Sequence, residues 1–368
     1  MLREIRHLRG LTDFVIDQRN SNRYQVIVKE SVGQTAYCFS TPIYNTTTRQ
    51  LVNMNFTKAK NGQIFYGTNG VISLLGNKCR FERCDGQTDV LLKDIPIIGC
   101  KKPFKQSDIM ITPTLNGLRF IGKGKGLQFT VKSETKQHSI RVHSTCFSVM
   151  KEKYRPFLSV SALYATDGKG RYAPLEITHE ELGQQTYALE LHHALTNGFF
   201  VFEINMYEPK LFQDTTVESK HPNANNAYGA VAFIGKTKEF GEQWLYSRPD
   251  FSKIQELTSK RISKVLLHIP VLNGSWEPLD IFIPQRRFCS FGSTWNKRVS
   301  PYRKITNSDN KGRYLTIDVT SVFTNHSSSG LSYNEGLIFK KAQEKGRFSV
   351  ISTGDCYSAP QILEIRYQ

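Results

Sequence analysis

Two short stretches of the chain come nearest to patterns that bind phosphate or metal. Gly229 and Gly235 precede Lys236 and Thr237, but five residues separate the glycines where a phosphate-binding loop has four, and Ala-Val-Ala-Phe-Ile between them is typical of a strand. The run His179-Glu180-Glu181 lacks the second histidine of a zinc-binding helix. The chain also lacks the G-x-S-x-G signature of an activated serine. We therefore expect a protein that is not an enzyme.

An enzyme acting on polysaccharide stays open as a minor alternative. The paired carboxylates of glycoside hydrolysis come from distant strands and leave no local signature, because only their separation in space identifies them.

Basic residues are unevenly distributed along the 368-residue chain, whose net charge is +17. Residues 1–150 hold 22 basic and 10 acidic side chains, residues 151–250 hold 10 and 13, and residues 251–368 hold 17 and 9. An excess of this size favours acidic partners such as polysaccharide, teichoic acid or nucleic acid, although a basic solvated surface would look the same. We find no nucleic-acid reader motif, so specific nucleic-acid binding is not expected.

A glycine-rich basic segment, Gly122-Lys-Gly-Lys-Gly126, could contact phosphate or sulfate groups. The alternative is a mobile hairpin tip, which the same glycines would suit. The predicted contacts to an anionic polymer are Arg119, Lys123, Lys125 and Lys132.

Aromatic and basic residues also occur together in the last third of the chain. Trp276 lies in the turn sequence Asn273-Gly-Ser-Trp-Glu-Pro278 and could face a ligand, whereas Trp244 and Trp295 are expected in the core. Aromatic and basic loops suit acidic sugars. The predicted ligand-binding residues are Trp276, Arg286, Arg287, Tyr302, Arg303 and Lys304.

No cofactor or metal is predicted. Oxygen ligands near Asp214 or in the Asn-rich segment 223–226 could bind calcium, but asparagine-rich turns occur equally without metal. The seven cysteines are too dispersed for a disulfide scaffold and are expected as mostly buried thiols.

Turn signals and short β-rich runs dominate the rest of the sequence. Asn-Gly pairs start at residues 61, 69, 116, 197 and 273, and Asp-Gly pairs start at 85 and 167. Such pairs between runs rich in β-branched and aromatic residues predict hairpins. Helical periodicity is confined mainly to 250–264, where Asp250 or Ser252 could cap a short helix. The chain is therefore predicted to be all-β and multi-domain.

Composition changes divide the chain into three segments. We expect a basic β-rich domain over 1–137, a β-rich middle segment over 138–209 and a β-sandwich over 210–368, so that one or two β-rich domains precede the sandwich. Length alone favours two or three domains.

The C-terminal segment, from about residue 211, resembles the DNRLRE family, a jelly-roll domain related to carbohydrate-binding module family 96. Residues 211–217 (LFQDTTV) look like the family's opening strand, and 222–229 (PNANNAYG) like its Asn-rich loop. The remaining matches follow in order: 246–251 (YSRPDF), 262–269 (ISKVLLHI), 294–296 (TWN), 315–321 (LTIDVTS), 333–339 (YNEGLIF) and 358–367 (SAPQILEIRY). The tryptophan that usually follows the "D-V-T" segment is absent. The resemblance implies a jelly-roll fold and non-catalytic recognition of a surface polysaccharide.

Two functional hypotheses follow. The first is a surface-recognition protein that binds carbohydrate or an anionic cell-wall polymer through the jelly-roll module. The second is a structural subunit of a phage virion or tail-like particle, because jelly rolls are common in capsid proteins, and residues 1–210 resemble segments that precede this domain in proteins of gut Firmicutes and their phages. Partners would be a glycopolymer, further copies of the chain or other particle subunits.

The opening 15 residues have no apolar signal segment, and no apolar run is long enough to span a membrane. Localisation therefore stays open between the cell surface, reached by a non-classical route, and a particle assembled in the cytoplasm.

Overall fold

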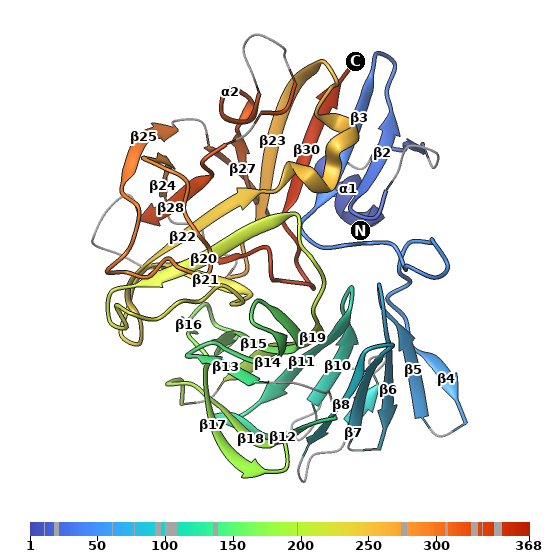
Figure 1. Cartoon of the computed structure of the whole chain (residues 1–368), viewed down its shortest axis with the longest axis vertical. Coiled ribbons are helices and arrows are strands. Elements are labelled where there is room, and N and C mark those ends of the chain that lie inside the picture. The colour runs from blue at the N-terminus through green and yellow to red at the C-terminus, as the bar shows by residue number, and fades with distance from the viewer. Residues whose placement is uncertain are drawn as a thin grey trace.

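The computed structural model in Figure 1 is built mainly of antiparallel strands arranged in four sheets. Strands account for 56% of the structure and helices for 6%, which confirms the predicted all-β, multi-domain fold class. It describes residues 1–10, 12–17, 22–60, 62–76, 78–92, 97–99, 109–134, 139–196, 198–273, 278–305, 308–324, 330–332, 334–341 and 348–368; residues 92, 97–99 and 308–311 are described by their backbone alone.

Two sheets form the C-terminal sandwich in the upper half of Figure 1. The first sheet contains, in spatial order, β1 (Val15–Ile16), β2 (Gln25–Lys29), β3 (Gln34–Phe39), β30 (Ile362–Tyr367), β23 (Ile262–Pro270), β27 (Tyr314–Asp318) and β26 (Ser308–Lys311). The second contains β25 (Pro301–Ile305), β24 (Leu279–Pro284), β28 (Leu337–Lys341), β22 (Gly241–Pro249), β21 (Val231–Thr237) and β29 (Ser349–Ser352), and β20 (Phe212–Glu218) also pairs with β22.

The core of this sandwich is formed by every second side chain along its strands. Ile281, Leu337 and Phe339 of the second sheet share one apolar cluster with Leu267 and Ile365 of the first sheet, and all five are buried. Successive side chains on a strand point to opposite faces. The intervening residues of β24, β28 and β22 therefore project from the outer face of the second sheet.

Two further sheets form the N-terminal sandwich in the lower half of Figure 1. One contains β17 (Glu176–Gly183), β18 (Thr186–His192), β12 (Gly126–Ser133), β8 (Gly86–Leu92), β7 (Lys78–Arg83), β6 (Val71–Leu75), β5 (Gly62–Tyr66) and β4 (Thr57–Ala59). The other contains β13 (Ser139–His143), β14 (Cys146–Glu152), β15 (Arg155–Thr166), β19 (Phe199–Met206), β11 (Gly117–Lys123), β10 (Ile109–Pro113) and β9 (Ile97–Gly99), with β16 (Tyr172–Ala173) paired to β15.

Stacked phenylalanine rings join the two sheets of the N-terminal sandwich. The ring centroid of Phe202 lies 4.6 Å from that of Phe120 on the neighbouring strand and 5.6 Å from that of Phe129 on the facing sheet. Offset aromatic pairs at these distances add to the free energy gained by burying the rings.

Helices are short. They are α1 (Leu2–Leu8), α2 (Thr320–Phe323) and the 3₁₀ helix η1 (Phe251–Leu257). The backbone N–H of Ser252 donates to the carboxylate of Asp250, so Asp250 is the N-cap that the sequence suggested. The helix ends at Leu257, however, and Ile262 already begins β23, so the predicted helix over 250–264 is only partly formed.

The sheets combine strands from distant parts of the chain. In β3, Gln34 pairs with Tyr367 of β30, so the first hairpin of the chain belongs to the C-terminal sandwich. The segment 207–211 leads from β19 of one sandwich to β20 of the other. Hydrogen bonding thus groups the strands differently from the three sequence segments 1–137, 138–209 and 210–368.

Candidate functional site

Aromatic rings and cations gather on the outer face of the second sheet of the C-terminal sandwich. The register pairs Phe282 of β24 with Lys304 of β25 and with Ile338 of β28, which places these side chains on one face. Asp280 pairs with Lys340 one step further along. Because Ile281 is in the core, this face is the one directed away from the sandwich interior.

The loop after β24 adds a second layer to this face. Its Trp295 packs edge to face on Trp244 of β22, with 5.3 Å between ring centroids, and Trp244 is 9% exposed. The Arg298 guanidinium lies 4.3 Å from the ring centroid of Trp295 and 5.4 Å from that of Trp244. Trp244 is thus buried, as the sequence predicted, whereas Trp295 is only half-buried.

Lys340 of β28 adds a second cation over the aromatic rings. Its Nζ lies 5.3 Å from the ring centroid of Trp244 and 5.1 Å from that of Phe282. A cation over an aromatic face is held by the ring quadrupole, more weakly than by a buried carboxylate. Trp244, Phe282, Trp295, Arg298, Lys304 and Lys340 are named together the cation–aromatic surface.

Of the six predicted ligand residues, Lys304 belongs to this surface, two others lie on β25, and two lie in the loop after β24. Lys304 forms an ion pair with Asp280 at 2.5 Å. Arg303 pairs with Ile283 and so projects from the opposite face of β25. Tyr302 is 76% exposed and lies where the register between β24 and β25 shifts by one residue.

Arg286 and Arg287 are exposed and follow directly after β24. The backbone hydrogen bond from Gln285 N to Ser300 O, at 2.9 Å, keeps this part of the loop next to the start of β25. The sixth predicted residue, Trp276, lies outside the described residues.

The structure separates the four predicted polymer contacts of the N-terminal part. Leu118 and Phe120 are buried between the sheets, so Arg119 projects from the outer face of β11, where its Nη2 donates to Tyr164 Oη at 3.4 Å. Lys132 of β12 alternates with the buried Val131 and is exposed on the far side of the sandwich.

Lys123 and Lys125 lie where the chain crosses from one sheet to the other. Arg119, Lys123, Lys125 and Lys132 therefore do not form a single surface.

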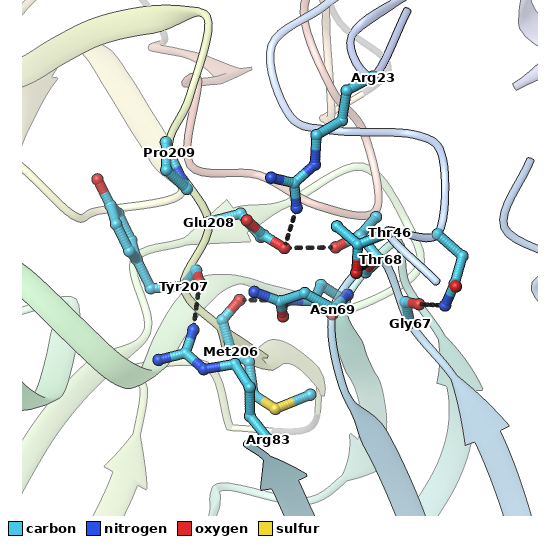
Figure 2. Close-up of polar contacts among 12 residues, drawn as sticks. Arg23, Thr46, Gly67, Thr68, Asn69, Arg83, Met206, Tyr207, Glu208 and Pro209 are labelled. Atoms are coloured by element: carbon cyan, nitrogen blue, oxygen red, sulfur yellow. Dashed lines mark hydrogen bonds and ion pairs between the residues drawn. The ribbon is translucent and has the colours of Figure 1, made fainter. Parts of the chain in front are cut away.

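A cleft of about 1020 Å³ lies at the junction of the two sandwiches. One wall is the loop over 45–57, rich in Asn and Thr; the others are the ends of β5, β7 and β14, the start of β15 and the segment 207–209. Figure 2 shows polar contacts among residues that line this cleft or lie beside it.

Several charged groups at the cleft are paired with neighbouring residues of the protein. Glu208, 1% exposed, accepts hydrogen bonds from Arg23 Nη2 at 2.5 Å and from Thr68 Oγ1 at 3.2 Å (Figure 2). Burial raises the pKa of the Glu208 carboxyl, while the nearby Arg23 charge opposes that rise. Arg83 donates to the backbone oxygen of Tyr207 at 2.9 Å.

The pKa of Asp85 is shifted in the opposite direction from that of Glu208. Partial burial alone would raise the pKa of its carboxyl, but the hydrogen bonds and charges of Arg83 and Lys151 outweigh burial and lower that pKa. The cleft therefore holds charges whose partners come from the protein itself, and the pair of Arg23 with Glu208 joins the C-terminal sandwich to the connecting segment 207–211.

The asparagine-rich segment serves a structural role at the same junction. Asn225 Nδ2 donates to the backbone oxygens of Ser290 and Ser293 at 2.6 and 2.7 Å, and its Oδ1 accepts from Arg141 at 2.7 Å. Asn223 Oδ1 accepts from Asn296 at 3.0 Å. Among the described residues, no group of three His, Cys, Asp or Glu side chains is placed to hold a metal ion.

No protein-family model matches the chain, and no curated protein matches it. The resemblance of residues 211–368 to the DNRLRE family therefore stays a prediction. Among the described residues, none of the helices is long and apolar enough to cross a membrane.

The local sequence carried only part of the signal for the cation–aromatic surface. The run Leu337-Ile-Phe-Lys340 places a lysine on the solvent side of an apolar strand, which strand alternation could have revealed. That Trp295 and Arg298 fold back over Trp244, some fifty residues earlier, depends on the path of the loop and has no local signature.

Proposed function

We propose that the chain is a non-catalytic recognition protein that binds an anionic polysaccharide or cell-wall glycopolymer at the cation–aromatic surface. The observation that carries this proposal is the contact of Arg298 and Lys340 with the rings of Trp244, Trp295 and Phe282. Aromatic faces pack against the apolar faces of sugar rings, and guanidinium or ammonium groups pair with carboxylate, sulfate or phosphate.

The way these cations are held supports the choice of surface. Arg298 is exposed, and its guanidinium contacts two rings and the backbone oxygen of Trp295 at 2.6 Å. Turning such a group toward a ligand anion costs little, because no buried carboxylate would be left unpaired. At the junction of the two sandwiches, by contrast, moving Arg23 toward a ligand would leave the buried Glu208 carboxylate without its cation.

The net charge of +17 supports an acidic ligand and predicts how binding depends on salt. Attraction between exposed charges is screened over about 8 Å at physiological ionic strength. Stacking on tryptophan is not screened in this way. Recognition that uses both contributions should weaken with salt without disappearing.

The test measures binding of the purified chain to neutral glycans, acidic polysaccharides, isolated bacterial cell wall and duplex DNA at low and several-fold higher salt. We expect one class of acidic glycopolymer to stay bound at high salt. Trp295→Ala should lower that affinity about tenfold, which corresponds to about 1.4 kcal/mol. Phe291→Ala is the control, because this half-buried ring contacts Tyr154 and Tyr228 instead.

Binding to every acidic polymer that vanishes with salt would contradict the proposal. So would unchanged affinity of a folded Trp295→Ala variant. Either result would direct attention to the alternative role as a particle subunit.

A further inference from the structure

Lys210 has its charged end enclosed at the junction of the two sandwiches. It lies in the short connection between β19 and β20, and its side chain is 7% exposed. Its Nζ directly contacts the carboxylate of Asp355, whose side chain is 8% exposed. Asp355 lies in the segment after β29, 145 positions further along the chain.

Aromatic rings line the space around the amine. Lys210 Nζ lies 5.4 Å from the ring centroid of Tyr207 and 5.2 Å from that of Tyr357. The adjoining cavity measures only about 10 Å³, at the lower limit of the volume that holds one water molecule. The amine and the carboxyl are therefore in contact where water has almost no access.

A second carboxyl lies beside the pair. Asp214 of β20 is 3% exposed, and its Oδ2 accepts a hydrogen bond from the backbone N–H of Gly354, the residue before Asp355. A Cβ at position 354 would lie 2.6 Å from this oxygen, so glycine leaves room for the close approach. Asp214 is thereby held against the segment that carries Asp355.

Burial shifts both groups toward their uncharged forms. It raises the pKa of Asp214 and lowers the pKa of Lys210, while their opposite charges act against both shifts. An uncharged amine is a nucleophile, and an uncharged carboxylic acid can donate a proton.

Glu203, a further buried carboxyl near Lys210, accepts hydrogen bonds from other parts of the protein. Its oxygens accept hydrogen bonds from Asn205 Nδ2 at 2.9 Å and from the backbone N–H groups of Tyr357 and Ser358 at 3.1 Å. These three donors occupy both oxygens of the Glu203 carboxyl. Asp214 is therefore the better placed proton carrier.

We propose that Lys210 and Asp355 join in an intramolecular isopeptide bond that the folded protein forms by itself. Lys210 Nζ attacks Cγ of the protonated Asp355 carboxyl, so that a C–N bond forms and a C–O bond breaks. Asp214 gives its proton to the departing oxygen, which leaves as water, and takes one proton from the nitrogen in exchange. The products are one amide and one water molecule, and no oxidant or other reactant is needed.

Two physical effects favour this reaction over a simple ion pair. Fixing amine and carboxyl in contact replaces an encounter between free groups, and such preorganisation corresponds to effective concentrations of about 10⁵ M or more. Exclusion of water removes the reagent that would hydrolyse the product. Leaving the pair charged would instead require the protein to solvate two buried ions.

The bond would tie the start of β20 to the segment after β29. It would close a large loop through the C-terminal sandwich at the point where the N-terminal sandwich is attached. A cross-link of this kind stabilises a fold mainly by restricting the unfolded chain. The inference does not depend on what the cation–aromatic surface binds.

The decisive experiment is the intact mass of the purified full-length chain, allowing for loss of the first methionine. We expect a mass lower by one water molecule than that of the encoded sequence. Proteolysis and fragmentation should identify a branched peptide joining Lys210 to Asp355. The full encoded mass would overturn the proposal if circular dichroism shows that the protein is folded. A branched peptide that joins Lys210 to a different carboxyl would also overturn it.

Variants separate the chemistry from the fold. Lys210→Arg and Asp355→Ala should show the full encoded mass, whereas Asp355→Asn should still cross-link with loss of ammonia instead of water. Asp214→Asn should slow or abolish the bond while both reacting residues remain. Lys264→Arg, at the more exposed ion pair of Lys264 with Asp318, is the matched control and should lose one water as the wild type does.

Discussion

The cation–aromatic surface and the junction between the sandwiches hold their charges in opposite ways. At the surface, Arg298 and Lys340 rest over aromatic rings near solvent. At the junction, Arg23 pairs with a carboxylate that is 1% exposed, and Lys210 contacts one that is 8% exposed. The surface cations are available to a ligand at small cost, while the junction charges depend on one another.

This difference separates two uses of the same residue types. A buried charge that loses its partner is costly, so junction residues should act mainly on stability. An exposed cation on a ring contributes little to folding but keeps its attraction for an anion. Substitutions in the two regions should therefore change different measurements.

The largest effect on stability is expected for Arg23→Ala. It leaves the Glu208 carboxyl without its cation and should lower the free energy of unfolding at neutral pH by about 3 kcal/mol. Burial raises the pKa of Glu208, so the penalty grows as pH rises from the ordinary glutamate value through the raised one. Urea unfolding at about pH 5 and about pH 8 measures this dependence.

Arg23→Ala combined with Glu208→Gln is the control, because it removes both charges of the pair. Its stability should lie above that of the single variant at the higher pH. An equal loss for Arg23→Ala at both pH values would contradict the role assigned to the pair.

A smaller effect is expected from His143, which also lies near the junction. Burial and the adjacent Arg141 charge lower the pKa of His143 to about 4, and Arg141 Nε donates to its Nε2 at 3.1 Å. The unfolded chain then binds a proton more readily than the folded one. Stability should fall by about 2 kcal/mol as pH drops from about 6.5 toward 4, allowing for partial exposure.

His143→Gln should make the pH dependence of unfolding shallower over that range. His192→Gln, at the half-exposed pair of His192 with Glu176, serves as the comparison. Identical pH profiles for wild type and His143→Gln would refute the assignment.

The smallest effect on stability is expected for Lys304→Ala at the surface. Lys304 forms an ion pair with Asp280, and the lysine side chain is 52% exposed. Exposed pairs of this kind contribute about 0.5 kcal/mol or less to the free energy of unfolding. Glycopolymer affinity should nevertheless fall about threefold, or about 0.7 kcal/mol. Thermal unfolding of the variant measures the loss of stability, and titration with the glycopolymer measures the loss of affinity. A large loss of stability with unchanged affinity would contradict the assignment of Lys304 to a binding surface.

Local sequence signals were sufficient for much of the β architecture. The pairs Asp85-Gly86, Asn69-Gly70 and Asn116-Gly117 each lie between strands that pair as neighbours, as turn chemistry predicts. Of the two caps that the sequence predicted, Asp250 and Ser252, the structure has Asp250, whose short carboxylate suits that position. The 3₁₀ helix after it ends at Leu257, and Ile262 begins the nine-residue strand β23.

Contacts between distant segments had no such signal. The pairing of β3 with β30 joins the two ends of the chain, and neither strand's composition specifies its partner. The meeting of Lys210 with Asp355 depends likewise on how one sandwich is attached to the other. For the candidate site, composition pointed to Lys304 and its neighbours, but the loop path alone brings Arg298 over Trp295.

One measurement tests recognition at the cation–aromatic surface most directly. Two variants with the same net charge are compared for affinity to the acidic glycopolymer at several salt concentrations: Arg298→Ala with Lys340→Ala, and Lys123→Ala with Lys125→Ala. We expect the first to lose at least tenfold in affinity, about 1.4 kcal/mol, and the second less than twofold. Equal losses in the two variants, or a larger loss in the second, would contradict recognition at the cation–aromatic surface.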